Sequence, residues 1–376
     1  MSEIYLGLMS GTSLDGVDGV LVDFSGPTLS VLAHSSAPFS PPLREELLAL
    51  NSSGSDELHR AALAANALVR VYAQVVADLL RQTGLDSAAV LAIGAHGQTV
   101  RHRPQLFDGT GYTLQLNNPA LLAELTGIDV IADFRSRDVA AGGQGAPLVP
   151  AFHQSVFGRA GETVLTLNVG GIANLTVVGP ALAEDVIGFD CGPGNALLDA
   201  WCWRHLGRTF DTDGAWAASG KVDADLLAIL LDEPYFSLPI PKSTGRDLFN
   251  PDWLTRQLEK AGPLAPVDVQ ATLTELSASV CAASIKRYGG DGTELIVCGG
   301  GAYNGHLMRR LQCHLPAIHV KSSQALGMPP LQVEASAFAW LARKTILRET
   351  ASLKTVTGAQ GARMLGAIYP SRLKKS

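Results

Sequence analysis

Residues 4–24 read IYLGLMSGTSLDGVDGVLVDF, in which two apolar runs flank a turn rich in glycine and hydroxyl residues. Short apolar runs on either side of a turn are typical of paired strands, so we predict a β-hairpin with an unusually polar turn. A later segment has the same plan, with an apolar run at 163–167, a glycine turn at 168–174 and a second apolar run at 175–178. We interpret the two as a weak internal repeat of one α/β domain. Chance similarity is the alternative, because α/β proteins make such units often.

Strands and helices alternate through the rest of the chain. We predict helices at 55–81, 196–205, 272–288 and 304–311, and strands at 90–95, 128–132, 185–190 and 295–298. The glycine-rich stretch 140–147 is the expected crossing between domains. The pattern predicts an α/β fold with mixed central sheets in two domains, 1–137 and 138–376, with a C-terminal helix that packs back on the first domain.

Composition excludes several classes of protein. The chain has 376 residues and a net charge of −6, and no basic stripe stands out, so we expect no nucleic-acid partner. The five cysteines are scattered and form no CxxC pair, which argues against a disulfide framework or a zinc site and favours a reducing, cytoplasmic compartment. We also expect no signal peptide and no membrane span.

Three glycine-rich turns each follow an apolar run, at 11–16, 170–171 and 299–301. Glycine lets backbone N–H groups converge on an anion, and the hydroxyls of Ser10, Thr12 and Ser13 add donors. Any one of them alone is best explained as a tight turn, whereas the set of three favours phosphate binding. The Walker pattern GxxxxGK[ST] is absent, and Pro241-Lys242-Ser243-Thr244-Gly245-Arg246 lacks the glycine frame, which favours a basic surface or dimer loop.

Several polar residues end predicted strands. Asp190 follows one strand and could take a proton from a hydroxyl or a water, the alternative being a cap on the next helix. Asp15 is the candidate to reach Mg²⁺, the alternative being an Asx turn. Taken singly, the remaining polar residues at such positions are better explained as structural: His96, Gln98, Arg135 and Glu334.

At these positions the sequence resembles the anhydro-N-acetylmuramic acid kinase family. The matching segments run in order from about residue 4 to residue 368: GLMSGTSLDGVD (7–18), GAHGQTV (94–100), DFR (133–135), GGQGAPLVP (142–150), NVGGIANL (168–175), GFDCGPGN (188–195), PKSTGR (241–246) and VCGGGAYN (297–304). The resemblance implies an actin-like, ribonuclease H-like fold with a nucleotide cleft between its two domains. It implies that ATP and water convert 1,6-anhydro-N-acetylmuramic acid to N-acetylmuramic acid 6-phosphate and ADP, in peptidoglycan recycling.

The resemblance also implies a role for each matching residue. Asp190 would be the general base that activates water. The nucleotide and Mg²⁺ would be held by Gly11, Thr12, Ser13, Leu14, Asp15, Gly16, Val17 and Asp18, by Asn168, Gly170 and Gly171, and by Gly299, Gly300, Gly301 and Asn304, with Asp15 nearest the metal. The sugar would be lined by Ser10, His96, Gln98, Arg135 and Glu334. Cys191 stands where the family commonly has threonine. We further expect a homodimer.

Two other functions use the same fold. An ATP-driven chaperone-like protein would carry an added substrate-binding module, and the chain ends about where the ATPase should. A kinase for an ordinary, open sugar would need only a base for the sugar hydroxyl, and Asp190 could serve it equally well. Fold alone does not separate this kinase from the ring-opening one.

Overall fold

The computed structural model describes residues 3–11, 14–182, 186–245 and 248–371. Contacts divide the chain into two compact units, the first made of Met1–Phe152 and Leu331–Ser376 and the second of His153–Pro330. The sequence places the boundary at residue 138 and assigns the C-terminal region to the second domain, with a C-terminal helix that packs back on the first. The division by contacts differs because the C-terminal segment adds a helix and a strand to the sheet of the first unit.

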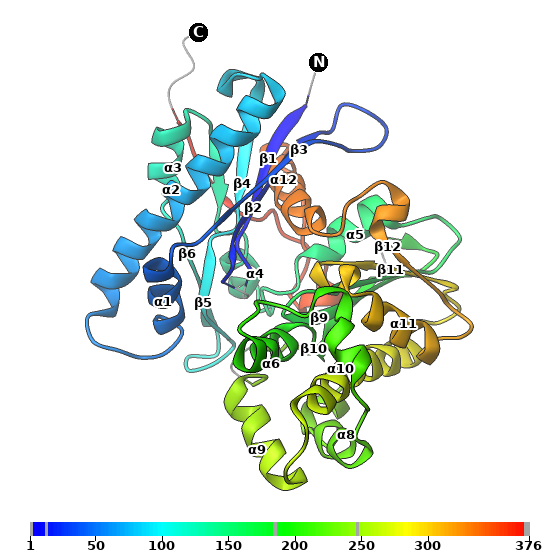
Figure 1. The fold of residues 1–376 in the computed structure, drawn as a ribbon. Helices are drawn as coiled ribbons and strands as arrows, with labels where there is room; N and C mark the ends of the chain where they lie inside the picture. The colour runs from blue at the N-terminus through cyan, green and yellow to red at the C-terminus, as the bar shows by residue number, and fades with distance from the viewer. Residues whose placement is uncertain (1–2, 12–13, 183–185, 246–247, 372–376) are drawn as a thin grey trace. The chain divides into compact units, whose positions relative to one another are not determined.

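The first unit is built on a six-stranded mixed sheet (Figure 1). In spatial order its strands are β13 (Ala367–Tyr369), β7 (Val130–Ala132), β4 (Val90–Ala95), β1 (Ile4–Met9), β2 (Gly16–Asp23) and β3 (Ser30–Pro38). The strands β1, β2 and β3 are antiparallel, whereas β4 runs parallel to β1 and β7 parallel to β4. A separate hairpin pairs β5 (Gln98–Pro104) with β6 (Gly111–Leu116). The helices are α1 (Pro41–Ala49), α2 (Glu57–Thr83), α3 (Pro119–Thr126), α4 (Ser136–Ala140), α12 (Gln332–Ile346) and α13 (Lys354–Thr357).

The second unit repeats the plan with five strands. Their spatial order is β10 (Val186–Pro193), β9 (Ile172–Val178), β8 (Val164–Val169), β11 (Glu294–Cys298) and β12 (His319–Ser322). The first three strands in sequence are again antiparallel and the last two parallel. The helices are α6 (Ala196–Leu206), α7 (Ala215–Ser219), α8 (Ala224–Leu231), α9 (Pro251–Ala261), α10 (Pro266–Tyr288) and α11 (Gly305–His314), and α5 (Val149–Phe157) contains the dividing point between the units. The α/β class predicted from the sequence is confirmed, and the strand order shared by the two sheets supports the predicted internal repeat.

Two helices cover opposite faces of the first sheet. A Cβ added at Gly19 would meet the side chains of Val75 and Leu79 on α2, whereas one at Gly7 would meet the backbone of α12. Gly7 of β1 and Gly94 of β4 are paired in register, and both face α12. Because neither has a side chain, α12 can lie directly against the two central strands.

The helix α2 is long and apolar enough, by length and composition, to cross a membrane. A core helix passes the same test, and here Leu68, Val69 and Tyr72 of α2 are fully buried in the core of the first unit.

Candidate active site

Ser10 follows β1 and is buried, with its hydroxyl held at two points. Its Oγ donates to the carbonyl of Gly97 at 2.9 Å, and the hydroxyl of Tyr72 lies 2.9 Å from the same Oγ. The Tyr72 hydroxyl also accepts from the Gly97 N–H at 3.0 Å, so its own proton is available for Ser10. Burial raises the pKa of Tyr72, which keeps this hydroxyl protonated. Tyr72 therefore fixes Ser10 from α2.

His96 links Ser10 to Arg135. Its Nδ1 lies 3.2 Å from the carbonyl oxygen of Ser10, which can only accept, so Nδ1 carries the proton. Its Nε2 accepts from Nε and Nη2 of Arg135, at 3.2 and 2.9 Å. Burial, with the Arg135 charge, lowers the pKa of His96 to about 3. The imidazole is therefore neutral at pH 7, which suits it to orienting Arg135 and not to acid catalysis.

Arg135 is also bound to the glycine-rich loop that the sequence singled out. Its Nη1 donates to the Gly145 carbonyl at 2.9 Å. Buried Asp138 holds that loop by accepting from the Gly145 N–H and the Thr357 hydroxyl, both at 2.8 Å. The loop predicted as an interdomain crossing thus helps to fix one of the predicted sugar-binding residues.

Glu334 lies in the first turn of α12 and is half-buried. Phe338 is one helical turn later, on the same face of α12, and its ring lies 4.7 Å from the ring of His96. Gly7 lets the backbone at Ala335 approach β1. Glu334 therefore lies near the start of the helix that packs on the strand ends carrying Ser10 and His96.

The polar turn after β1 is only partly described, because Thr12 and Ser13 lie outside the described residues. The Gly11 carbonyl accepts from Gln98 Nε2 at 3.1 Å, which joins two predicted site residues. Leu14 has a φ of 59° and Asp15 is exposed. The last residues of the predicted loop, Gly16, Val17 and Asp18, already belong to β2, and the Val17 side chain is in the core.

In the second unit, Asp190 lies at a bulge in β10 and is held at three atoms. Its N–H donates to the Lys242 carbonyl at 3.3 Å, its carbonyl accepts from the Tyr235 hydroxyl at 2.8 Å, and its Oδ2 accepts from the Thr244 N–H at 2.9 Å. The helix α6 begins after Asn195. The bond between Oδ2 and Thr244 directs the carboxylate to the 241–244 segment, which does not favour the capping role considered as its alternative.

The other two glycine turns lie together at the ends of β8 and β11. A Cβ at Gly299 would meet the backbone of Val169 at 2.7 Å, and one at Gly301 would meet the Val169 side chain. Gly299 has a φ of 76°, which glycine adopts without strain. Asn168 is buried, with Oδ1 3.7 Å from the Cys298 thiol. The structure thus brings the second and third predicted turns into contact.

The second glycine turn, and Asn304 after the third, fix two helix starts. The carbonyls of Gly170 and Gly171 accept from the N–H groups of Asn195 and Ala196, at 2.8 and 3.1 Å. Asn304 caps α11 by accepting from the Leu307 N–H at 3.0 Å. Helix N-termini beside glycine turns can bind phosphate, because their N–H groups point outward.

Comparison with known proteins identifies the family. The family described as anhydro-N-acetylmuramic acid kinase matches residues 3–371. The chain belongs to this family. The protein named anhydro-N-acetylmuramic acid kinase in Albidiferax ferrireducens is 69% identical and covers 99% of this chain and 100% of its own length. The one in Variovorax paradoxus is 62% identical, covering 98% of this chain and 99% of its own length.

Among solved structures, the activator of 2-hydroxyisocaproyl-CoA dehydratase from Clostridium difficile, with bound ADPNP, is similar in fold. It is 12% identical, with a TM-score of 0.48, and the similarity covers 93% of this chain and 96% of the activator. A likeness this distant carries no argument about the chemistry of the kinase chain.

The described residues of this kinase could hold Mg²⁺ only through few protein ligands. The described residues contain no group of three or more histidine, cysteine or acidic side chains that could hold a metal. Mg²⁺ bound with a nucleotide commonly takes one or two carboxylates, with phosphate and water as its other ligands. The exposed carboxylate of Asp15 suits such a site.

The residues that hold Asp190 could not be recognised from the sequence. The PKSTGR segment is a recognisable motif. Its contact with Asp190 is made by the backbone N–H of Thr244, however, and a backbone contact does not depend on residue type. Tyr235 and Tyr72 are aromatic residues within apolar stretches, and only their hydroxyl contacts show their roles.

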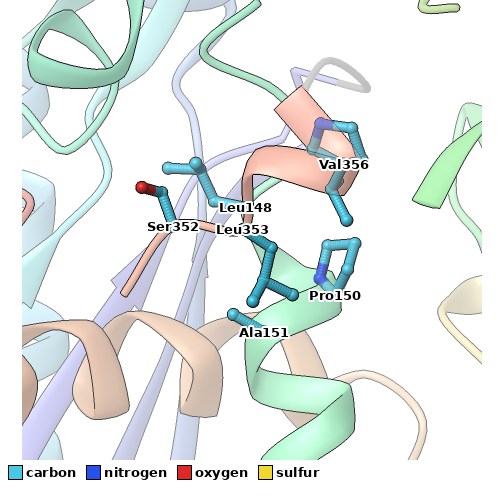
Figure 2. A pocket seen from close by; sticks show the side chains of 7 residues that line it. Leu148, Pro150, Ala151, Ser352, Leu353 and Val356 are labelled. Carbon is cyan, nitrogen blue, oxygen red and sulfur yellow. The ribbon is translucent and has the colours of Figure 1, made fainter. Parts of the chain in front are cut away.

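A small pocket in the first unit is a poor candidate for the active site of the kinase. It is lined mostly by apolar side chains: Pro147, Leu148, Pro150, Ala151, Ser352, Leu353 and Val356. Figure 2 labels all of these residues except Pro147. The polar group among them, the Ser352 hydroxyl, accepts from the Arg363 N–H at 2.9 Å. A lining without a titratable group offers no acid or base for a reaction.

Proposed function

We propose that the chain is the cytoplasmic kinase that opens 1,6-anhydro-N-acetylmuramic acid with water, phosphorylates O6 with ATP and releases N-acetylmuramic acid 6-phosphate and ADP. The observation that carries this proposal is the family match over residues 3–371, with relatives above 60% identity along their full length. The product would re-enter cell-wall synthesis, so the role is peptidoglycan recycling.

Asp190 is the proposed general base. A water attacks the anomeric carbon and gives a proton to the Asp190 carboxylate. The bond from that carbon to O6 breaks, and O6 takes the γ-phosphoryl group while ADP leaves. The sequence expects Asp190 at a strand end, but β10 continues to Pro193, so Asp190 lies inside the strand at its bulge. The proposal is supported by this irregular position and by the Thr244 N–H on Oδ2, which directs the carboxylate.

The glycine turns are the proposed nucleotide contacts. Asn168, Gly170 and Gly171 would offer donors to the phosphates, and Gly299 to Gly301 with Asn304 would lie at the adenosine. The turn from Gly11 to Asp18 would add further backbone donors. Asp15 would hold Mg²⁺, through water or directly, and bound Mg²⁺ would neutralise the charge of the phosphates.

The proposed sugar contacts lie in the first unit: Ser10, His96, Gln98, Arg135 and Glu334. Arg135 supplies a cation, and the sugar carries a carboxylate on its lactyl group. The neutral imidazole of His96 accepts two bonds from the guanidinium and so fixes its direction. The polar contact of Gln98 with Gly11 would couple the sugar contacts to the phosphate turn.

The reaction is tested with Mg-ATP and the anhydro sugar in ¹⁸O-labelled water. We expect label at the anomeric hydroxyl of a 6-phosphorylated product. Turnover with open sugars alone would refute ring opening.

Asp190→Asn tests the base, and Asp225→Asn is its matched control, because Asp225 is an exposed carboxylate in the first turn of α8. We expect Asp190→Asn to stop turnover and to keep ADP binding, and Asp225→Asn to retain both. Full activity in Asp190→Asn would exclude it as the base. The proposed homodimer is tested separately, by light scattering of the purified chain.

A further inference from the structure

The segment 235–244 is hydrogen-bonded to Asp190 through several residues, which distinguishes it from a loop that only faces solvent. Three different atoms of Asp190 are bonded to it: the amide to Lys242, the carbonyl to Tyr235 and the carboxylate to Thr244. The contacts come from residues 45 to 54 positions further along the chain. The direction of the Asp190 side chain therefore depends on how this segment is folded.

The side chain of Lys242 folds the segment. Its ammonium donates to the carbonyls of Tyr235 and Phe236, at 3.2 and 3.1 Å, and so joins the two ends of the segment. It also lies over two aromatic rings, 4.7 Å from the centroid of Tyr235 and 6.0 Å from that of Phe189. Cations over aromatic faces are attracted by the ring quadrupole. The Lys242 ammonium therefore makes its contacts within the protein and holds residue 242 close to residues 235 and 236.

The base of the segment is itself anchored. Phe249 stacks on Phe236 at 5.6 Å and meets Trp253 edge to face at 5.3 Å. The Trp253 indole donates to Glu233 at 2.8 Å, just before Tyr235. The end of the segment at Tyr235 and Phe236 is therefore held in place. Because Lys242 is hydrogen-bonded to that end, it also restricts the position of Thr244.

We propose that Lys242 is a positioning residue for Asp190: its ammonium ties residues 235 and 236 to residue 242, so that the Tyr235 hydroxyl and the Thr244 N–H hold Asp190 in one orientation. The proposal deepens the proposed function and rests on Asp190 being the base. It differs from the surface or dimer loop that the sequence favoured, and from a lysine that binds phosphate.

The electrostatics around Lys242 add a second consequence. Burial lowers the pKa of Lys242, with a smaller contribution in the same direction from Arg287 of α10, while Cys191 and Asp190 of β10 oppose it. Tyr235 stays protonated because burial raises its pKa. The ammonium favours the charged form of the Asp190 carboxylate, so removing it will make that carboxylate easier to protonate.

The test compares Lys242→Met, which keeps most of the apolar stem, with Lys242→Arg, which keeps the charge. Lys260→Met is the matched control, because Lys260 is exposed on α9. Turnover of the anhydro sugar is measured across pH at saturating and limiting ATP. We expect kcat of Lys242→Met to fall roughly 10- to 100-fold, as for a misplaced catalytic group. The KM for ATP should stay within about twofold, and the acid limb of the kcat profile should move to higher pH. Lys242→Arg should recover part of the loss, and Lys260→Met should behave as the unchanged protein.

Two results would overturn the proposal. One is an unchanged kcat and pH profile in Lys242→Met, and the other is a large rise in the KM for ATP at constant kcat, which would make Lys242 a phosphate ligand. If Lys242→Met does not fold, Tyr235→Phe removes only the hydroxyl on the Asp190 carbonyl, and unchanged kcat there overturns the proposal as well. Failure of the base assignment is distinguishable, since it alone predicts an active Asp190→Asn.

Discussion

Replacing Gly7 with alanine would test the close approach of α12 to the first sheet. The added Cβ would lie 2.8 Å from the carbonyl carbon of Ala335 and from the amide nitrogen of Ala339, and closer still to the Ala335 oxygen. All three are backbone atoms of α12, so no side chain can rotate away. The helix must move or the strand must bend.

The size of the effect follows from these distances. Carbon atoms pack at about 3.5–4.0 Å and the Ala335 oxygen is the closest of the three atoms, so α12 must retreat by more than about 1 Å. A gap of that size forfeits a quarter to a half of the dispersion energy along the helix, whose residues Val333, Ala335 and Phe338 are fully buried. We expect Gly7→Ala to lower the free energy of unfolding by about 3 kcal/mol, the upper part of the range for overpacked cores. For a unit of this size, that corresponds to a fall in Tm of roughly 6–12 °C.

Thermal melting and urea unfolding, followed by circular dichroism, measure the change. Gly54→Ala is the matched control, because its added Cβ would meet the end of the flexible Arg60 side chain at 3.2 Å. The retreat of α12 would also displace Glu334, so the KM for the sugar should rise more than the KM for ATP. A Tm within about 1 °C of the unchanged protein would refute the packing argument.

Three further predictions concern other parts of the structure. His96 and His153 are buried, and burial lowers the pKa of each to about 3. Between about pH 6.5 and 3 the unfolded chain binds a proton on each of these histidines and the folded chain does not. The free energy of unfolding should therefore decrease as the pH is lowered, by up to about 1.4 kcal/mol per pH unit for each histidine. Urea unfolding at pH 7 and pH 5.5 measures this, and His153→Gln should reduce the slope; an unchanged slope would contradict it. Asp213 has a φ of 57° and accepts from the Gly305 N–H at 2.9 Å, beside the proposed adenosine turn. Calorimetry should therefore find weaker ADP binding in Asp213→Ala and near-normal binding in Asp213→Asn. Equal ADP affinity in the two variants would contradict this. Glu275 is buried and accepts from two nitrogens of Arg310 at 2.6 and 2.9 Å, so Glu275→Gln should lower the free energy of unfolding by about 1–3 kcal/mol, and a loss below about 0.5 kcal/mol would contradict this.

The elements that could be predicted are those that local pattern controls. Helical spacing of apolar residues predicted a helix at 55–81, and the structure has α2 at Glu57–Thr83. The helix predicted at 272–288 begins earlier, at Pro266, because proline suits the first turn of a helix. The expected domain boundary followed the glycines of 140–147. A C-terminal helix on the first domain was expected, but no local pattern reveals that β13 joins the first sheet.

The candidate site divides along the same line. Turns such as 168–171 and 299–301 can be predicted, because glycine follows an apolar run. The support for Asp190 does not, because Tyr235 and Thr244 reach it from distant parts of the chain through a hydroxyl and a backbone N–H. Such contacts depend on tertiary packing, and residue type alone cannot encode them.

The interrupted first unit sets an order on synthesis at the ribosome. Its sheet emerges early, but α12 and β13 come from Leu331–Ser376 and follow the whole second unit. Until then the bare glycine face at Gly7 and Gly94 has no helix to cover it, whereas the second unit already has every strand of its sheet. Chains generally fold from the N-terminus as they are made, so here the inserted unit can finish first and the first unit closes last. A nascent chain stalled near residue 330 would therefore expose an uncovered sheet to the chaperones of the cell.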